Sequence, residues 1–140
     1  MNANERIVTI FGGSKCCEDD AEYREAHRVG ELLAEAGFTI CTGGYSGVME
    51  AASRGAHEGG GRVLGITMKQ FDKEPNRYLT EKFPSEHFYE RLQRLIMQSI
   101  GYIALRGGML PEVSSRIAAA KGVSSALNVE ILCGVPSSKI

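Results

Sequence analysis

Gly101-Tyr102-Ile103-Ala104-Leu105-Arg106-Gly107-Gly108-Met109-Leu110-Pro111-Glu112 is the stretch of sequence that decides the fold. Its apolar first half predicts a buried strand, the glycine pair predicts a tight turn, and the Pro-Glu pair predicts the start of a helix. In an open α/β sheet, ligands bind at the carboxyl ends of parallel strands, where a glycine turn frees backbone N–H groups for an anion. The stretch therefore predicts an anion-binding turn with a carboxylate beside it.

The same order of strand, glycine pair and helix occurs twice earlier in the chain. Ile7–Phe11 precedes one turn and Phe38–Cys41 precedes the other. Each turn is followed by a helical pattern: one is capped by Asp19 or Asp20, and the other runs from Val48 to about Glu58. The apolar positions predicted for the first helix are Ala26, Val29, Leu32, Leu33 and Ala36. Because carboxyl ends of parallel strands share one sheet edge, the three turns predict a nucleotide-like ligand bound by Gly12, Gly13, Ser14, Gly43, Gly44, Ser46, Gly107, Gly108 and Met109.

The rest of the chain continues the alternation of strands and helices. Arg62–Thr67 is a third predicted strand, and the polar segment Met68–Pro84 is predicted to be a long functional loop. A helix is predicted to begin at Ser85, with its apolar face at Phe88, Leu92, Leu95, Ile96 and Ser99. A further helix to about Lys121 and a strand at Val129–Cys133 complete the pattern. We expect residues 1–140 to form a single α/β domain, three-layered and doubly wound (Rossmann-like), with a mainly parallel sheet.

Composition excludes several classes of protein. The formal net charge of −1 provides no basic face for nucleic acid. The start of the chain lacks the basic-then-apolar layout of a signal peptide, and no apolar run is long enough for a membrane helix, so we expect a cytoplasmic protein that binds no membrane. The cysteines show no CxxC spacing, and His27, His57 and His87 are dispersed, so no metal site is predicted.

The glycine turns do not match the common nucleotide motifs. None fits GxGxxG with an acidic residue about 20 positions on, and none has the lysine of a P-loop. Two charged residues remain as candidates. Arg91, beside Leu92 at the edge of the predicted apolar face, either extends to solvent or points into a cleft. Glu112 either serves the chemistry or only complements the helix dipole.

Several ordered motifs carry a resemblance to a known family. They are Ile7–Ser14, the GGYSGVME segment Gly43–Glu50, the GGRVLGI segment Gly60–Ile66, and Glu90-Arg91 ahead of Tyr102–Leu105. In these motifs the chain resembles the LOG family of cytokinin riboside 5′-monophosphate phosphoribohydrolases, also called lysine decarboxylase-like, within a superfamily that includes molybdenum cofactor carriers. The similarity extends from Ile7 to about Lys121.

The resemblance implies an activity and a set of residues. The activity is hydrolysis of the N-glycosidic bond of AMP or an N6-substituted nucleoside monophosphate, with Arg91 and Glu112 as catalytic residues. No metal or organic cofactor is implied. A homodimer is implied, with the Ser85–Ser99 helix or its neighbour near the interface. The alternative within the superfamily is a non-catalytic protein that binds or carries a nucleotide or a molybdenum cofactor (pterin).

The chain departs from the family signature PGGxGTxxE. Arg106 replaces the proline, Gly107-Gly108-Met109 matches GGx, and Leu110-Pro111-Glu112 follows at once, without the Gly-Thr pair. Glu112 is thus the counterpart of the signature glutamate, offset by two residues. Since the Gly-Thr pair contacts the 5′-phosphate in the family, its absence predicts a weaker phosphate site.

Overall fold

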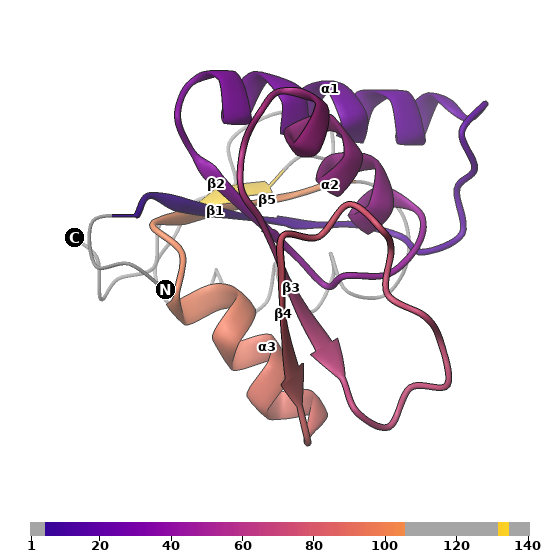
Figure 1. The fold of residues 1–140 in the computed structure, drawn as a ribbon, viewed down its shortest axis with the longest axis vertical. Coiled ribbons are helices and arrows are strands. Elements are labelled where there is room, and N and C mark those ends of the chain that lie inside the picture. The colour runs from indigo at the N-terminus through magenta and orange to yellow at the C-terminus, as the bar shows by residue number, and fades with distance from the viewer. Residues whose placement is uncertain (1–4, 106–131, 135–140) are drawn as a thin grey trace.

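A computed structural model describes residues 5–105 and 132–134 of the chain. These residues form one six-stranded sheet in the order β4-β3-β2-β1-β5-β6, with helices on both faces (Figure 1). The strands are β1 (Ile7–Phe11), β2 (Thr39–Thr42), β3 (Val63–Met68), β4 (Glu81–Ser85), β5 (Gly101–Ala104) and β6 (Leu132–Gly134). The helices are α1 (Ala21–Glu35), α2 (Val48–Glu58) and α3 (Phe88–Met97).

The strand order places a topological switch point beside β1. Strands β1 to β4 are added in one direction across the sheet, and β5 then pairs on the other side of β1. These five strands are parallel, whereas β6 runs antiparallel to β5. In doubly wound sheets the ligand crevice lies at the carboxyl ends of the strands where the order reverses. Here that point is the end of β1 and β5, where Leu105 N donates to Phe11 O at 2.8 Å.

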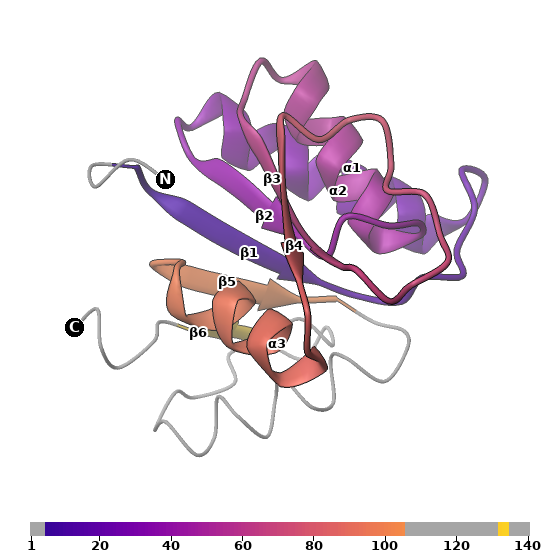
Figure 2. The same ribbon diagram turned by 60° about the horizontal axis from the view of Figure 1, so that its bottom comes forward.

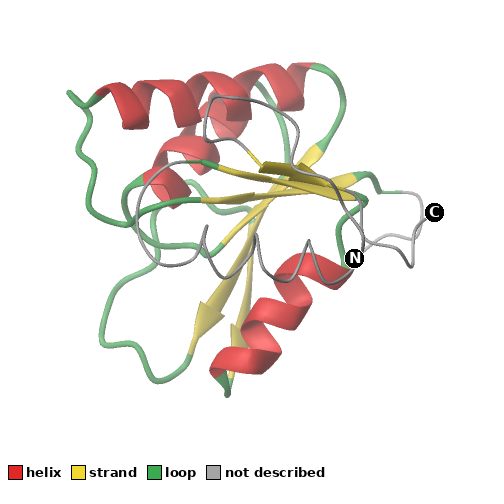
Figure 3. Cartoon of the chain, turned by 180° about the vertical axis from the view of Figure 1, so that it is seen from behind, coloured by secondary structure: helices red, strands yellow, loops and turns green. Residues whose placement is uncertain are grey.

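The helices divide into two layers around the sheet. Helices α1 and α2 cover one face and α3 covers the other, as Figures 2 and 3 show. The α1/α2 side is a buried apolar cluster that includes Ile10, Ile40 and Val48. On the α3 side, Leu92, Leu95 and Ile96 pack against β1, β3 and β5. The predicted α/β, three-layer, mainly parallel fold is confirmed.

Helices α1 and α2 approach each other closely through glycine. A Cβ added at Gly55 in α2 would lie 1.9 Å from His27 O, and one added at Gly30 in α1 would lie 2.2 Å from Ala52 O. Both distances are far below van der Waals contact, so these positions admit no side chain while the backbones stay where they are. Leu32, predicted to be on the buried face of α1, is exposed because that face runs through Tyr23, Ala26, Gly30 and Ala34 instead.

Several predicted boundaries need correction. The Met68–Pro84 segment is not all loop, because its end belongs to β4, which pairs with β3 from Leu64 to Met68. Helix α3 begins at Phe88 rather than Ser85, and Phe88 is half-exposed instead of buried. Asp20 is the N-cap residue of α1, but its carboxylate accepts from Cys17 N at 2.8 Å rather than from the first turn. The prediction of a helix after Glu112 lies outside the described residues.

None of the helices within residues 5–105 is long and apolar enough to span a membrane. The prediction of a single domain over residues 1–140 includes segments outside the described residues and stays a prediction.

Replacing Gly55 with alanine tests the close approach of α1 and α2. Helix propensity alone predicts that Gly55→Ala stabilises the protein by about 1 kcal/mol. The contact with His27 O predicts the opposite, a loss of about 1–3 kcal/mol in the free energy of unfolding. Urea denaturation measures the difference, and Glu25→Ala on the exposed side of α1 is the control, with an expected change within about 0.5 kcal/mol. Stabilisation by Gly55→Ala contradicts the packing described.

The thiol of Cys41 in β2 provides a pH-dependent test of the core. Cys41 is fully buried, and burial raises the pKa of its thiol from 9.0 to about 12. Because the unfolded thiol ionises first, the stability from this group is complete below pH 9 and is lost as the pH rises towards 12. The stability difference between the wild type and Cys41→Ala should therefore shrink by about 1.4 kcal/mol between pH 8 and pH 10. An unchanged difference in urea denaturation at the two pH values would show that the thiol ionises in the folded protein.

Candidate functional site

The candidate site is a pocket beyond the carboxyl ends of β1, β2 and β3. Its volume is about 140 Å³. The lining residues come from the turns after β1 and β2, the start of α2, the segment between β3 and β4, and α3. They are Ser14, Tyr45, Met49, Phe71, Lys73, Phe88 and Arg91. Three of the sequence-predicted regions thus meet here: the first two glycine turns and the helix that carries Arg91.

Arg91 is one of the residues that line this pocket. It is one turn into α3 and only 2% exposed, so of the two alternatives predicted for Arg91 the side chain points into a cleft and does not extend to solvent. Its Nε donates to Ile66 O in β3 at 2.8 Å, and its Nη2 donates to Gly43 O after β2 at 3.0 Å. The planar guanidinium thereby joins α3 to two strands and has a fixed orientation.

The charge of Arg91 has no carboxylate partner among residues 5–105. Its neighbours are the rings of Tyr45 and Phe71, whose centroids lie 5.6 and 5.7 Å from the guanidinium carbon. Burial lowers the pKa of Arg91 from its ordinary value. A buried cation without an anion is costly, so this arrangement favours an anionic group at the pocket.

Tyr45 anchors the segment between β3 and β4 over the site. Its hydroxyl donates to Met68 O at 3.2 Å and accepts from Met68 N at 2.9 Å. Asn76, which is buried, donates from Nδ2 to Tyr45 O at 3.0 Å and from its backbone N to Gly44 O at 2.8 Å. These bonds tie the segment to the turn after β2 and hold Phe71 against Tyr45, with ring centroids 5.5 Å apart.

The first two glycine turns lie against each other. Val48 N donates to Gly13 O at 2.8 Å, and Ser46 Oγ donates to Ser14 O at 2.8 Å. Gly47 has a φ of +70°, and a Cβ there would lie 2.4 Å from Gly13 O, so the contact requires glycine. The structure therefore places Gly12, Gly13 and Ser14 beside Gly43, Gly44 and Ser46, as expected for strands that end at one edge.

Some backbone N–H groups that were predicted to bind an anion are already hydrogen-bonded within the protein. The N–H of Gly44 donates to Thr42 Oγ1 at 3.1 Å, and the N–H of Val48 is bonded to Gly13 O. Glu50 occupies the first turn of α2 and accepts a hydrogen bond from Tyr23. An acidic residue there already complements the positive end of the helix dipole. The positive charge at the pocket consequently comes from Arg91 and Lys73 more than from α2.

The model of the SLOG cluster4 family (LDcluster4) matches residues 5–124. The chain belongs to the SLOG cluster4 family.

Two relatives are similar in sequence to this family member. An uncharacterized protein of Archaeoglobus fulgidus is 32% identical over 120 residues, which cover 84% of this chain and 78% of the relative. The probable cytokinin riboside 5′-monophosphate phosphoribohydrolase LOGL5 of Oryza sativa subsp. japonica is 30% identical over 113 residues. That match covers 74% of this chain but 43% of the rice protein, so the chain spans less than half the length of this relative. The resemblance to LOG-type proteins is confirmed at the level of the superfamily.

Solved structures share the fold. The X-ray structure of TM1055 aligns with a TM-score of 0.64 and 28% identity, covering 73% of this chain and 61% of that protein. The molybdenum cofactor binding protein of Rippkaea orientalis aligns with a TM-score of 0.72 over 86% of this chain and 73% of that protein. At 24% identity the second similarity shows the fold alone.

The third glycine turn lies outside the described residues. The predictions for Gly107, Gly108, Met109 and Glu112 therefore stay predictions, as does the effect of Arg106. Sequence reasoning missed Tyr45, Phe71 and Asn76. Tyr45 could have been predicted from its position inside the GGYSG turn. Nothing in the polar Met68–Pro84 segment distinguished Phe71 or Asn76.

Removing the hydroxyl of Tyr45 tests the anchoring of the segment over the pocket. Tyr45→Phe leaves Met68 N and Met68 O without their partner, so we expect a loss of about 1–3 kcal/mol in the free energy of unfolding. Tyr89→Phe is the matched control, because Tyr89 is 73% exposed, and it should change stability by less than about 0.5 kcal/mol. Equal effects of the two substitutions in urea denaturation would contradict the role assigned to Tyr45.

Proposed function

We propose that the protein hydrolyses the N-glycosidic bond of a nucleoside 5′-monophosphate, AMP or an N6-substituted derivative, to the free base and ribose 5-phosphate. The observation that carries the proposal is Arg91: a buried guanidinium, fixed by two backbone carbonyls, without a carboxylate partner among residues 5–105. It lies in a pocket at the carboxyl ends of the strands, where doubly wound folds bind ligands. The carboxylate of Glu112, together with an anionic substrate bound beside it, would supply the missing countercharge.

The chemistry requires an acid beside the sugar. Cleavage of an N-glycosidic bond passes through an oxocarbenium-like ribose, which a carboxylate near the anomeric carbon stabilises while water attacks. The resemblance to LOG proteins gives this role to Glu112. Arg91 would orient Glu112 and contact the ribose or the leaving base through the guanidinium edge that its two carbonyl bonds leave free.

Binding of the 5′-phosphate is assigned to the glycine turns. The backbone N–H groups of Gly107, Gly108 and Met109 would hold it, with Gly12, Gly13, Ser14, Gly43, Gly44 and Ser46 lining the neighbouring turns. Lys73 lines the same pocket and adds a second cation. Tyr45 and Phe71 offer apolar faces beside Arg91, which suits a ligand that is part sugar phosphate and part planar base. No metal or organic cofactor takes part in this scheme.

The similarity to the rice phosphoribohydrolase supports the proposal, although the chain spans 43% of that protein. Family resemblance further supports a cytoplasmic homodimer. Phe88 and Tyr89 at the start of α3 are 49% and 73% exposed and would contribute to its interface.

A second candidate is a protein that binds a nucleotide or a molybdenum cofactor (pterin) without reaction. It is favoured by the departure of residues 106–112 from the family signature, because the Gly-Thr pair that contacts phosphate in hydrolases does not follow Met109. A protein that retains the scaffold and Arg91 but lacks this pair keeps a binding site while losing part of the catalytic turn.

An assay for release of free base separates the two candidates. With AMP and an N6-substituted AMP as substrates, the wild type should release the base, and Glu112→Gln and Arg91→Ala should each lower kcat/KM by at least about 100-fold, the loss typical of a transition-state contact. The matched control is Arg94→Ala on the same helix, since Arg94 pairs with Glu90 at the surface and should keep full activity.

The alternative outcomes are distinct in the same experiment. Saturable binding of AMP by the wild type without release of base contradicts the hydrolase and supports the binding protein. Release that persists in Glu112→Gln shows that the signature glutamate has another counterpart. Circular dichroism of each variant establishes that the fold is retained.

A further inference from the structure

A second group of chemically active side chains lies between α1 and α2, apart from the pocket around Arg91. His27 and Glu31 are one turn apart on α1, and Glu58 is the last residue of α2. The imidazole nitrogen of His27 and one carboxylate oxygen from each glutamate lie within 4.8 Å of one another. None of these residues lines the pocket of Arg91.

We propose that His27, Glu31 and Glu58 bind a divalent transition-metal ion of the Zn²⁺ class. One imidazole and two carboxylates form a donor set that suits Zn²⁺, with remaining positions for water. With metal–ligand distances of about 2.1 Å, a tetrahedral site separates its donors by about 3.4 Å. The donors present here therefore need to move by little more than about 1 Å, within the range of side-chain rotation.

The backbone beneath the three donors holds them in place. Gly55 of α2 packs directly on the backbone of α1. A Cβ added at Gly55 would lie 1.9 Å from His27 O and 3.0 Å from Glu31 N. The two turns of α1 that carry His27 and Glu31 therefore contact α2 one turn before Glu58. Little rearrangement of the helices is needed to bring the third donor to the other two, and a bound ion would join α1 to α2.

Hydrogen bonds orient Glu58 as a ligand. Its Oε2 lies 2.6 Å from Nε2 of His27, and its Oε1 accepts from Nε of Arg54 at 3.0 Å. These two hydrogen bonds hold both oxygens of the Glu58 carboxylate in place. Arg54 can keep Oε1 while an ion between His27 and Glu58 takes Oε2, which matches the outer hydrogen bonding usual for ligating carboxylates.

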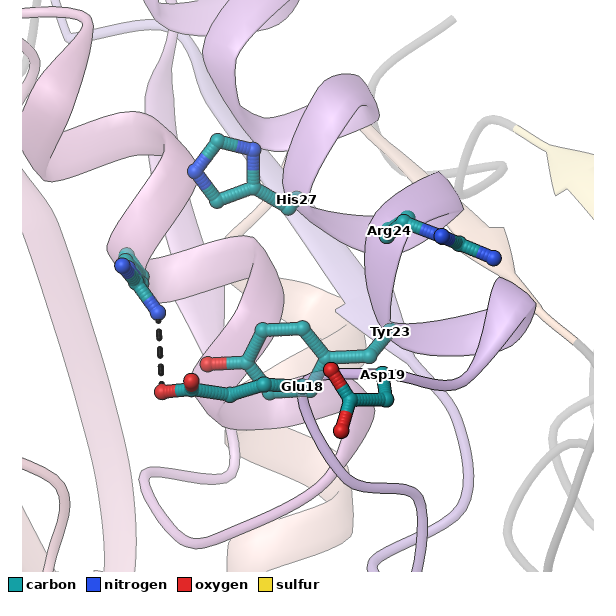
Figure 4. A pocket seen from close by; sticks show the side chains of 6 residues that line it. Glu18, Asp19, Tyr23, Arg24 and His27 are labelled. Atoms are coloured by element: carbon teal, nitrogen blue, oxygen red, sulfur yellow. Dashed lines mark hydrogen bonds and ion pairs between the residues drawn. The ribbon is translucent and has the colours of Figure 1, made fainter.

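Some charged side chains around the three donors compete with a metal ion, and others attract one. Arg28 pairs with Glu31, but its side chain is 62% exposed and can turn into solvent when an ion takes the carboxylate. Glu18 and Asp19 are exposed at the adjoining pocket of about 310 Å³, which His27 also lines. Figure 4 shows Tyr23 and His27 reaching from α1 toward the same side, whereas Arg24 points away. Arg54 also lines this pocket and pairs with Glu18 at 3.0 Å, which leaves Asp19 as the carboxylate there that could attract a cation.

The sequence predicted no metal site because the three histidines are far apart in the chain. Only the spacing of His27 and Glu31, four residues apart on a helix, was visible there. The third donor comes from α2, 27 residues beyond Glu31, and is brought to the other two by the glycine contact between the helices.

Isothermal titration with ZnCl₂ tests the proposal in the full chain. Cys16→Ser/Cys17→Ser serves as the background, because these thiols are exposed or half-buried and thiolates are common zinc ligands. We expect one saturable Zn²⁺ site in this background. His27→Ala and the isosteric Glu31→Gln should each weaken the affinity by at least about tenfold, the loss reported even for partners of metal ligands.

The control is His57→Ala, which removes an exposed histidine from the same helix as Glu58 and should leave the affinity unchanged. Circular dichroism confirms that the variants are folded, and Glu31→Gln keeps the test valid if His27→Ala disturbs the helix contact. Absence of saturable binding in the background overturns the proposal, as does an unchanged affinity in either His27→Ala or Glu31→Gln.

Discussion

The buried guanidinium of Arg91 is the interaction on which the site depends. Two of its hydrogen bonds end on the carbonyls of Ile66 and Gly43, so a single side chain fixes β3 and the end of β2 relative to α3. Hydrogen bonds from a charged donor contribute more than neutral ones. The carbonyls do not neutralise the charge, however, and the remaining positive field is directed at the pocket. The same side chain therefore both stabilises the fold and supplies positive charge to the pocket.

The sheet topology explains why this group faces a pocket. The order of strands reverses at β1, and the pocket lies at the carboxyl edge of this sheet, where the turns after β1 and β2 line it. Tyr45 and Asn76 then hold the segment between β3 and β4 across one side. In this arrangement the polar segment is part of the site, since it brings Phe71 and Lys73 to the rim.

The sequence was sufficient for the order of strands and helices and for the glycine turns at one edge, because periodicity and glycine pairs are local signals. It was not sufficient to predict that Arg91 is buried. The two carbonyls that accept hydrogen bonds from its guanidinium lie 25 and 48 residues away in the chain, and a charged residue beside Leu92 is typical of a surface boundary. Strand β4 was missed because Glu81–Ser85 carries charges and Pro84, which are tolerated in an edge strand. Leu32 was misplaced because the buried face of α1 runs through Tyr23, Ala26, Gly30 and Ala34, and Leu32 lies on another face of the helix.

The central claim is that the guanidinium of Arg91 contacts an anionic nucleotide. The most direct measurement is NMR of the arginine side-chain nitrogens during titration with AMP, with adenosine as the uncharged comparison and Arg91→Lys to assign the signal. The account predicts a saturable shift of the Arg91 resonances with AMP and a much weaker response to adenosine. Resonances of Arg91 that stay unchanged at saturating AMP would contradict it.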